Sequence, residues 1–365
     1  MTQPVYVSEP VNLSEFEAFA KDKVSEATFG YYVSGANDEI TLRENRAAFE
    51  RIKLLPHVLR DISQRTMATT ILGHTYPTPL FIAPMATQRL AHPSGELGMV
   101  RGAGQHGVGV VLSTMSTTKI EDVAVARTAP TWFQLYIYKD RWVSESLVKR
   151  AEAAGYTALV LTVDTPFLGR RERDVRSRYA PPPGYEPVNL PFENLASLNA
   201  NNESNFAEFM RTTMRSDDMT WDSIAWLKTV TNMPIFLKGI LRADDAAKAV
   251  KVGADGIIVS NHGGRQLDTV PATIEVLPEI AAAVQGRIPI LVDGGIRRGT
   301  DVIKAVALGA QGVLIGRPML WALAYNGEAG VSRALQLLID EIDLAMALCG
   351  CASLQDMTTD LLRMP

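Results

Sequence analysis

Short runs of continuously apolar, often β-branched residues recur along this chain, each followed by a polar turn and then by a helical pattern. Runs that are apolar at every position are typical of strands buried on both faces, as in a parallel sheet. Eight consecutive units of this kind predict an α/β fold of the (β/α)8 TIM-barrel type. An open doubly wound sheet is the alternative, but it leaves the number eight unexplained. The runs occupy residues 79–86, 107–114, 132–137, 157–164, 233–240, 256–262, 288–295 and 312–317.

The segments between these runs have helical periodicity. In residues 144–154 and 243–252, leucine, valine and alanine recur at spacings of three and four, which places them on one face of a helix. Gly155, Gly253 and Gly309 each follow such a segment, where a helix commonly ends in the left-handed conformation.

Residues 102–107 fit the dinucleotide-binding pattern G-x-G-x-x-G. The pattern here closes a predicted helix and precedes a strand, whereas the nucleotide-binding motif follows a strand and opens a helix. We therefore interpret it as a helix end followed by a tight turn.

We expect a single domain over residues 1–365. Within the N-terminal part, helices are predicted at 13–29 and 40–49, followed by an irregular run. The domain would divide into an N-terminal helical segment, a barrel and C-terminal helices, at residues 1–78, 79–320 and 321–365.

A long polar insert follows the fourth predicted strand, at about residues 165–219, and a helix is expected at 221–229. A long loop at the carboxyl end of a barrel strand is either a lid over the site or a disordered insert. We favour the lid.

Composition and charge exclude several classes of protein. The net charge is −4 with no long basic run, so we expect no nucleic-acid partner. The longest apolar stretches fall short of the ~20 residues that span a bilayer, so no membrane association is expected. The N-terminus does not resemble a signal peptide, and Cys349 and Cys351 have no further metal-ligating residues nearby. We expect a cytoplasmic protein without a metal site.

The end of the sixth predicted strand carries the sequence SNHGGRQLD, from Ser260 to Asp268. Reacting groups of a barrel lie at the carboxyl ends of its strands. His262 could act there as a base and Arg265 could bind the carboxylate of a small anionic substrate. The alternative is a solvated turn whose histidine only caps the backbone. Because polar residues end nearly every predicted strand, we favour a functional site.

Two glycine-rich turns end the seventh and eighth predicted strands, at residues 293–297 and at Gly316-Arg317. Barrels commonly bind phosphate at these positions, through backbone N–H groups, a helix N-terminus and arginine. Lys238, at the end of the fifth strand, could then stabilise negative charge on a reduced flavin ring, or could pair with an acid for structural reasons. Three further polar residues could hydrogen-bond such a ring or satisfy one another in the barrel core: Ser113, Gln134 and Thr162.

Six long motifs, in order along the chain, resemble those of the FMN-dependent (S)-2-hydroxy acid oxidases, the family of glycolate and lactate oxidases. The resemblance runs from about Phe16 to Met357. The motifs are YYVSGANDEITLRENR from Tyr31, FQLYIYKDR from Phe133, LTVDTPFLGRRERD from Leu161, LKGI from Leu237, SNHGGRQLD from Ser260 and DGGIRRGTDVIKAVALGA from Asp293.

The resemblance implies a role for each matched residue. His262 would be the base, Asp164 its hydrogen-bond partner, and Arg171 and Arg265 the pair that binds the substrate carboxylate. Tyr31 and Tyr136 would hydrogen-bond the carboxylate and hydroxyl of the substrate. Whether the electrons move as a hydride or through a carbanion stays open. The FMN-binding positions would be Pro84, Met85, Ala86, Ser113, Gln134, Thr162, Lys238, Ser260, Asp293, Gly294, Gly295, Ile296, Arg297, Gly316 and Arg317.

Two substrate-facing positions depart from the glycolate-specific members of the family. Met85 replaces a threonine and Met115 replaces a tryptophan, which should make the pocket larger and more apolar. We therefore expect L-lactate as substrate and pyruvate as product. A glycolate oxidase, a broader (S)-2-hydroxy acid oxidase and a lactate 2-monooxygenase are the alternatives.

Oxygen is the expected electron acceptor, giving hydrogen peroxide. The barrel begins after only about 78 residues, which leaves no room for a haem domain, and the insert has no membrane-binding apolar run. Family members are commonly homotetramers, and we expect the same here.

Readings from other classes remain to be tested. An FMN barrel could catalyse an isomerisation without net redox change, and a barrel lyase or aldolase could use Lys238 as a Schiff-base lysine. A non-catalytic relative would not be expected to retain every matched catalytic position.

Overall fold

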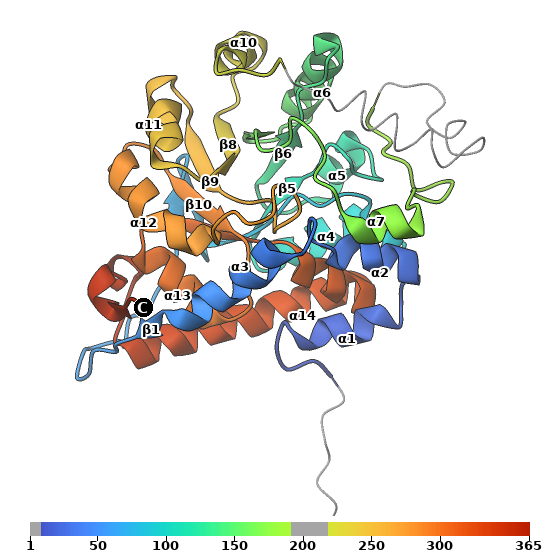
Figure 1. Ribbon diagram of the computed structural model, residues 1–365. Helices are drawn as coiled ribbons and strands as arrows, with labels where there is room; N and C mark the ends of the chain where they lie inside the picture. The colour runs from blue at the N-terminus through green and yellow to red at the C-terminus, as the bar shows by residue number, and fades with distance from the viewer. Residues whose placement is uncertain (1–8, 191–217) are drawn as a thin grey trace, which may run out of the picture.

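The computed structural model describes residues 9–190 and 218–365. Eight parallel strands form a closed barrel, in the order β10–β11–β4–β5–β6–β7–β8–β9 (Figure 1). All eight coincide with the predicted apolar runs, so the (β/α)8 prediction is confirmed and the open sheet is excluded. The strands are β4 (Leu80–Ile82), β5 (Gly109–Leu112), β6 (Thr131–Leu135), β7 (Leu159–Thr162), β8 (Ile235–Ile240), β9 (Gly256–Val259), β10 (Ile290–Asp293) and β11 (Gly312–Ile315).

The helices around the barrel also agree with the predictions. Those expected at 144–154, 221–229 and 243–252 correspond to α6, α10 and α11. Gly155, Gly253 and Gly309 adopt φ values of 78°, 80° and 105°, the left-handed conformation expected after a helix. The helices are α4 (Gly95–Gly104), α5 (Ile120–Ala126), α6 (Arg141–Ala153), α7 (Glu172–Ser177), α10 (Asp222–Val230), α11 (Ala243–Lys251), α12 (Thr273–Val284), α13 (Gly299–Ala307), α14 (Arg317–Cys349) and the 3₁₀ helix η1 (Gln88–Leu90).

The G-x-G-x-x-G segment closes α4 and leads into β5, as interpreted from the sequence. Gly107 has φ of 64°, which is the turn between the two elements. No nucleotide site is formed by this turn, because the pattern opens no helix.

Aromatic rings fill the interior of the barrel. The ring of Trp132 lies 4.9 Å from that of Phe81 and 4.8 Å from that of Phe236, between centroids. Gly256 makes room for Phe236, since a Cβ on this glycine would lie 2.2 Å from the phenyl ring. A hairpin, β2 (Thr69–Ile71) and β3 (His74–Tyr76), packs Ile71 and Tyr76 against the same core. The amino end of the barrel is therefore filled.

The N-terminal segment differs from the prediction in one respect. The helix expected at 13–29 is two helices, because the chain turns at 22–25 and Ser25 caps the second one by accepting a hydrogen bond from Thr28 N at 3.2 Å. The helix expected at 40–49 is present and slightly longer. The three helices are α1 (Glu15–Lys21), α2 (Glu26–Val33) and α3 (Ile40–Arg51).

The rest of the segment and the C-terminus are more ordered than predicted. The run expected to be irregular contains the β2–β3 hairpin and β1 (Lys53–Leu54), which pairs antiparallel with β12 (Leu362–Arg363). The expected C-terminal helices are one long helix, α14, which starts inside the last barrel unit and is interrupted at Asn326 and Gly327. Two 3₁₀ helices follow it, η2 (Leu354–Asp356) and η3 (Thr359–Leu361).

The insert after β7 begins with the short helix α7, which packs against α2 (Figure 1). The part of the insert on which the lid prediction chiefly depends, 191–217, lies outside the described residues. Within the described parts of the chain, every helix is too short or too polar to cross a membrane.

Candidate active site

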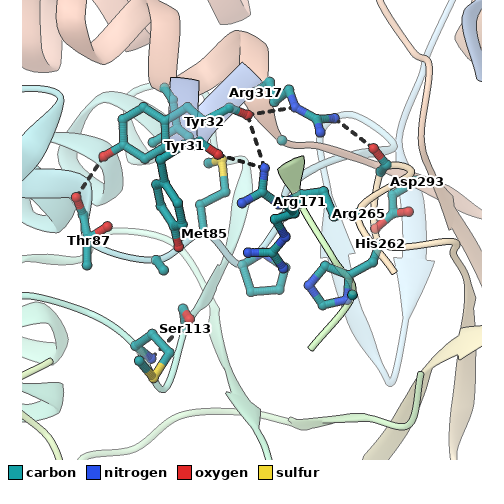
Figure 2. A pocket seen from close by; sticks show the side chains of 18 of the residues that line it. Tyr31, Tyr32, Met85, Thr87, Ser113, Arg171, His262, Arg265, Asp293 and Arg317 are labelled. Carbon is teal, nitrogen blue, oxygen red and sulfur yellow. Dashed lines mark hydrogen bonds between the residues drawn. The ribbon is translucent and has the colours of Figure 1, made fainter. Parts of the chain in front are cut away.

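A cavity of about 360 Å³ lies at the carboxyl ends of the barrel strands. Residues from α2, from several strand ends and from the insert meet there (Figure 2). Most of the predicted site residues line it: Tyr31, Pro84, Met85, Ala86, Ser113, Met115, Tyr136, Thr162, Arg171, Lys238, His262, Arg265, Asp293, Gly294, Gly295, Ile296, Arg297, Gly316 and Arg317.

Three predicted site residues do not line the cavity but hold residues that do. Gln134 accepts a hydrogen bond from Ser113 Oγ at 3.3 Å and donates one to Thr162 Oγ1 at 3.0 Å. Ser260 Oγ accepts a hydrogen bond from Lys238 Nζ at 2.8 Å. Asp164, the third, contacts His262. Their contribution to the site is therefore made through these neighbours.

His262 is held in one orientation by the backbone and by Asp164. Its Nδ1 lies 3.0 Å from Asp164 Oδ1, and its backbone N–H donates to Ser260 Oγ at 3.1 Å. The residue adopts φ of 58°, which is uncommon outside glycine, and Gly263 and Gly264 follow with φ of 65° and 74°. This left-handed turn brings the imidazole from the end of β9 into the cavity.

The charges of this pair suit a base. Burial lowers the pKa of His262 despite the nearby carboxylate. Burial opposes ionisation of Asp164, but its charge interaction and hydrogen bond with His262 outweigh this and hold the pKa of Asp164 below its usual value. An ionised carboxylate only accepts hydrogen bonds, so Nδ1 carries the proton and Nε2 is left as the acceptor.

Two arginines stand near the histidine. Arg265 Nη1 donates to the carbonyl oxygens of Tyr31 and Ser34, at 2.7 and 2.8 Å. Burial and the neighbouring Arg171 lower the pKa of Arg265 to about 10, so it stays charged at neutral pH. The Nε of Arg171 is buried without a hydrogen-bond partner among the described residues. Both side chains extend toward the same part of the cavity as His262, where an anion would satisfy them (Figure 2).

Tyrosines form the adjoining wall. The ring of Tyr31 lies between the guanidinium of Arg265, at 5.1 Å, and the ring of Tyr179, stacked at 4.3 Å. Burial raises the pKa of Tyr136, with a further contribution from Asp164, so its phenol stays protonated and able to donate.

Sequence reasoning missed several residues of the cavity, among them Tyr32, Asp174 and Tyr179. Tyr32 and Asp174 lie inside two of the quoted motifs, which was a signal that could have been used. Tyr179 lies in the insert, beyond the end of the motif that starts at Leu161, so only the folded structure reveals its place in the cavity.

The other end of the cavity has the features of a flavin site. Lys238 Nζ lies 3.0 Å from Asp293 Oδ2, and both side chains are buried. The other carboxylate oxygen of Asp293 is buried without a hydrogen-bond partner in the described structure, so it could accept one from a ligand. Lys238 thus has an acid partner, as the structural alternative predicted, and it also faces the cavity.

Glycines shape the predicted phosphate site. Gly295 has φ of 84° and fits tightly against α3, where a Cβ would lie 1.8 Å from Asn45 O. A Cβ on Gly316, in contrast, would meet no protein atom closer than 3.9 Å. Gly316 therefore leaves space on the cavity side, directly before the first turn of α14.

Arg317 begins α14 and faces the same space. Its Nε, Nη1 and Nη2 donate to the carbonyl oxygens of Tyr32, Gly263 and Ser34, at 2.9, 3.0 and 2.9 Å. These bonds leave one N–H on each terminal nitrogen, so the residue could still contact a phosphate. The residues at this end fit FMN.

Comparison with known proteins agrees with this geometry. The family model described as FMN-dependent dehydrogenase matches residues 20–364. The chain belongs to this family. An L-lactate oxidase from Nostoc sp. is 53% identical over 98% of this chain and 99% of its own length. A glycolate oxidase from Spinacia oleracea is 49% identical over 96% of this chain and 95% of its own.

Solved structures of members of the FMN-dependent dehydrogenase family have the same fold. A mandelate oxidase crystallised with 3,3-difluoro-2-hydroxy-3-phenylpropionic acid has a TM-score of 0.87 and is 42% identical, covering 97% of this chain and 98% of its own. The predicted family, FMN as cofactor and the oxidoreductase class are thereby confirmed. The lyase and isomerase alternatives are set aside.

Proposed function

We propose that this protein oxidises L-lactate to pyruvate and passes the electrons to O₂, which gives hydrogen peroxide. The observation that carries the proposal is that His262, the arginine pair and two methionines line one cavity. The histidine and the two arginines fit the hydroxyl and carboxylate of a 2-hydroxy acid. The methionines fit the methyl group of lactate. The L-lactate oxidase and glycolate oxidase relatives support an acid of this size.

The arginines would bind the carboxylate. Arg265 is held by its bonds to the backbone of Tyr31 and Ser34, so its planar group keeps one orientation. Arg171 comes from the insert, directly before the first residue of α7. Guanidinium groups suit this role because they offer paired N–H donors to two carboxylate oxygens. The phenol of Tyr31 would donate a further hydrogen bond to the same group.

His262 would take the proton that the substrate loses. Its lowered pKa keeps the imidazole neutral at pH 7, and the bond to Asp164 directs Nε2 into the cavity. After the transfer the imidazolium is stabilised by the carboxylate of Asp164 at 3.0 Å. Tyr136, protonated, would donate a hydrogen bond to the substrate hydroxyl oxygen.

FMN, when bound, accepts the two electrons of the oxidation. Lys238 and Asp293 would contact it at the end of β8 and β10, and Gln134 and Ser260 would orient the groups in contact with it. Backbone N–H groups of Gly294 to Arg297 and of Gly316, with Arg317, would hold its phosphate.

Met85 and Met115 would determine the preference among acids. Met115 is 6% exposed, so an additional methyl group on the substrate would be removed from water against it. A methyl group in an apolar pocket contributes ~1–3 kcal/mol, which is a preference and not an exclusion. Glycolate should therefore be oxidised, but less efficiently.

We also propose a homotetramer in the cytoplasm. Leu344 and Leu348 lie four residues apart on α14 and are exposed, as expected of a helix face covered by another subunit. Cys349 and Cys351 are free thiols, as is usual in a reducing compartment. Light scattering of the purified protein tests the assembly, and a mass other than that of four chains would refute it.

The test of the proposed reaction is an anaerobic absorbance spectrum before and after addition of L-lactate, and separately of glycolate. We expect a flavin spectrum that bleaches faster with lactate and returns when air is admitted, with peroxide released. Faster bleaching with glycolate would refute the lactate preference. A flavin that neither acid reduces would refute the substrate class, and acetate released in place of pyruvate and peroxide would identify a monooxygenase.

A further inference from the structure

Asp174 is a carboxylate in the wall of a cavity that is expected to bind an anion. It lies in the first turn of α7, and its side chain is 20% exposed. Its Oδ2 is 3.8 Å from Nη1 of Arg171, while its Oδ1 is buried with no hydrogen-bond partner among the described residues. A carboxylate with one oxygen buried and unpaired is unfavourable unless neighbouring charges compensate it.

The charges in the cavity show which partners Asp174 has. Among the described lining residues, two are acids, Asp174 and Asp293. Asp293 is paired with Lys238, so Asp174 is the acid at the arginine end. Burial raises the pKa of Asp174, whereas the charges of Arg265 and Arg171 and, last in size, an interaction with the Ser34 side chain lower it. Asp174 in turn raises the pKa of Arg265.

We propose that Asp174 is a positioning residue that balances the charge of Arg171 and Arg265 until a substrate carboxylate takes over that role. The inference rests on the proposed function, because it takes the arginine pair as the carboxylate site. At 3.8 Å the contact is longer than a hydrogen bond, so Arg171 keeps its N–H donors for the incoming acid.

This arrangement has a consequence for binding. Asp174 offsets part of the positive charge of Arg171 and Arg265. The electrostatic attraction of the site for an anion is therefore weaker than it would be for the two arginines alone. Any carboxylate, including the 2-oxo acid product, is therefore bound less tightly than the arginine pair alone would bind it. Weaker binding of the product favours its release.

The test compares Asp174→Asn with the wild-type holoenzyme. Oxalate and pyruvate are the probes. Neither can be oxidised at this site, because neither has a hydrogen on a carbon that carries a hydroxyl group. Their Kd is read from the change in flavin absorbance. Removing one negative charge a few ångströms from an anion should lower Kd on the order of tenfold.

Two control variants separate this effect from a structural one. Glu172→Gln removes the same charge from the same helix, where Glu172 pairs with the exposed Arg176 at 3.1 Å, and Kd should not change. Asp174→Glu restores the charge and should return Kd toward the wild-type value. If Asp174→Asn does not fold, Asp174→Ser, which removes the same charge, is used in place of Asp174→Asn.

The outcomes are distinct. An equal or higher Kd for oxalate in Asp174→Asn, with the wild type binding normally, overturns the inference and leaves the proposed function intact. A wild-type holoenzyme that binds neither oxalate nor pyruvate overturns the proposed function and the inference with it. A lower Kd in Asp174→Asn but not in Glu172→Gln supports the role of Asp174.

Discussion

Replacing Asp164 with asparagine should slow reduction of the flavin while leaving FMN bound. Asp164 Oδ1 accepts a hydrogen bond from His262 Nδ1 at 3.0 Å, and the Asp164 side chain is 13% exposed, so water replaces little of the lost interaction. A hydrogen bond to a charged group contributes about 1.5–3 kcal/mol, and each 1.4 kcal/mol corresponds to a factor of about ten in rate. The positive charge develops on His262 only as the proton moves. The rate constant should therefore fall by about 10- to 100-fold.

The assay is anaerobic stopped-flow absorbance with saturating L-lactate. Thr165→Val is the matched control, because Thr165 Oγ1 donates to the same carboxylate oxygen at 3.0 Å without carrying charge. The carboxylate that accepts this bond stays ionised before and after the proton moves to His262. Loss of the bond therefore affects both states alike, and the rate should fall by less than about tenfold. If Asp164→Asn reduces its flavin as fast as Thr165→Val does, the charge of Asp164 is not what supports His262, and the reasoning fails.

Four other outcomes follow from the structure. Burial lowers the pKa of His262 below its ordinary value of 6.5, so kcat/KM should decrease only as the pH falls below that value; an acid limb centred higher would contradict this. In the unfolded chain, His262 takes up its proton at a higher pH than in the folded protein. The stability that His262 contributes is therefore complete above about pH 6.5 and is lost as the pH falls toward the folded pKa. Melting temperatures measured over a series of acidic pH values test this. Gly256→Ala should cost about 1–3 kcal/mol of unfolding free energy through its clash with Phe236, whereas Gly30→Ala, with no atom within 4 Å of the new Cβ, should cost none; equal melting temperatures would refute this. Lys238→Met leaves a buried carboxylate without its cation, at a cost of about 3–5 kcal/mol, and should weaken FMN binding as measured by fluorescence titration; unchanged affinity would exclude a role for Lys238 in the flavin site.

The barrel could be predicted because its strands are buried on both faces. Each therefore appears as an unbroken apolar run, and eight such runs separated by helical segments leave few alternatives. The ends of the strands were predicted less well. In β4, for example, the run 79–86 was expected to be strand throughout, but the ladder stops at Ile82. Pro84 cannot donate to a neighbouring strand, and the residues after it turn into the cavity.

The site could be predicted only in part. His262 and Arg265 are visible as polar residues at a strand end, but Tyr31 has no such signal, and only its motif pointed to a role. Tyr179 lies in the insert, where hydrophobic periodicity gives no orientation. Its stacking on Tyr31 depends on how α7 docks against α2, which is a tertiary contact between segments some 150 residues apart.

The attachment of α3 sets an order in which the protein can become active. The backbone N–H groups of Ile40 and Thr41 are capped by Asp268, 228 and 227 positions later, and Asn45 exchanges two hydrogen bonds with Asn261. At a synthesis rate of about 5–20 residues per second, the first helices wait about 10–50 s on the ribosome for these partners. A chain released before Asn261 would lack the partners of α3, together with His262 and Arg265. Premature termination should therefore yield a fragment in which α3 is undocked and the proposed base is missing.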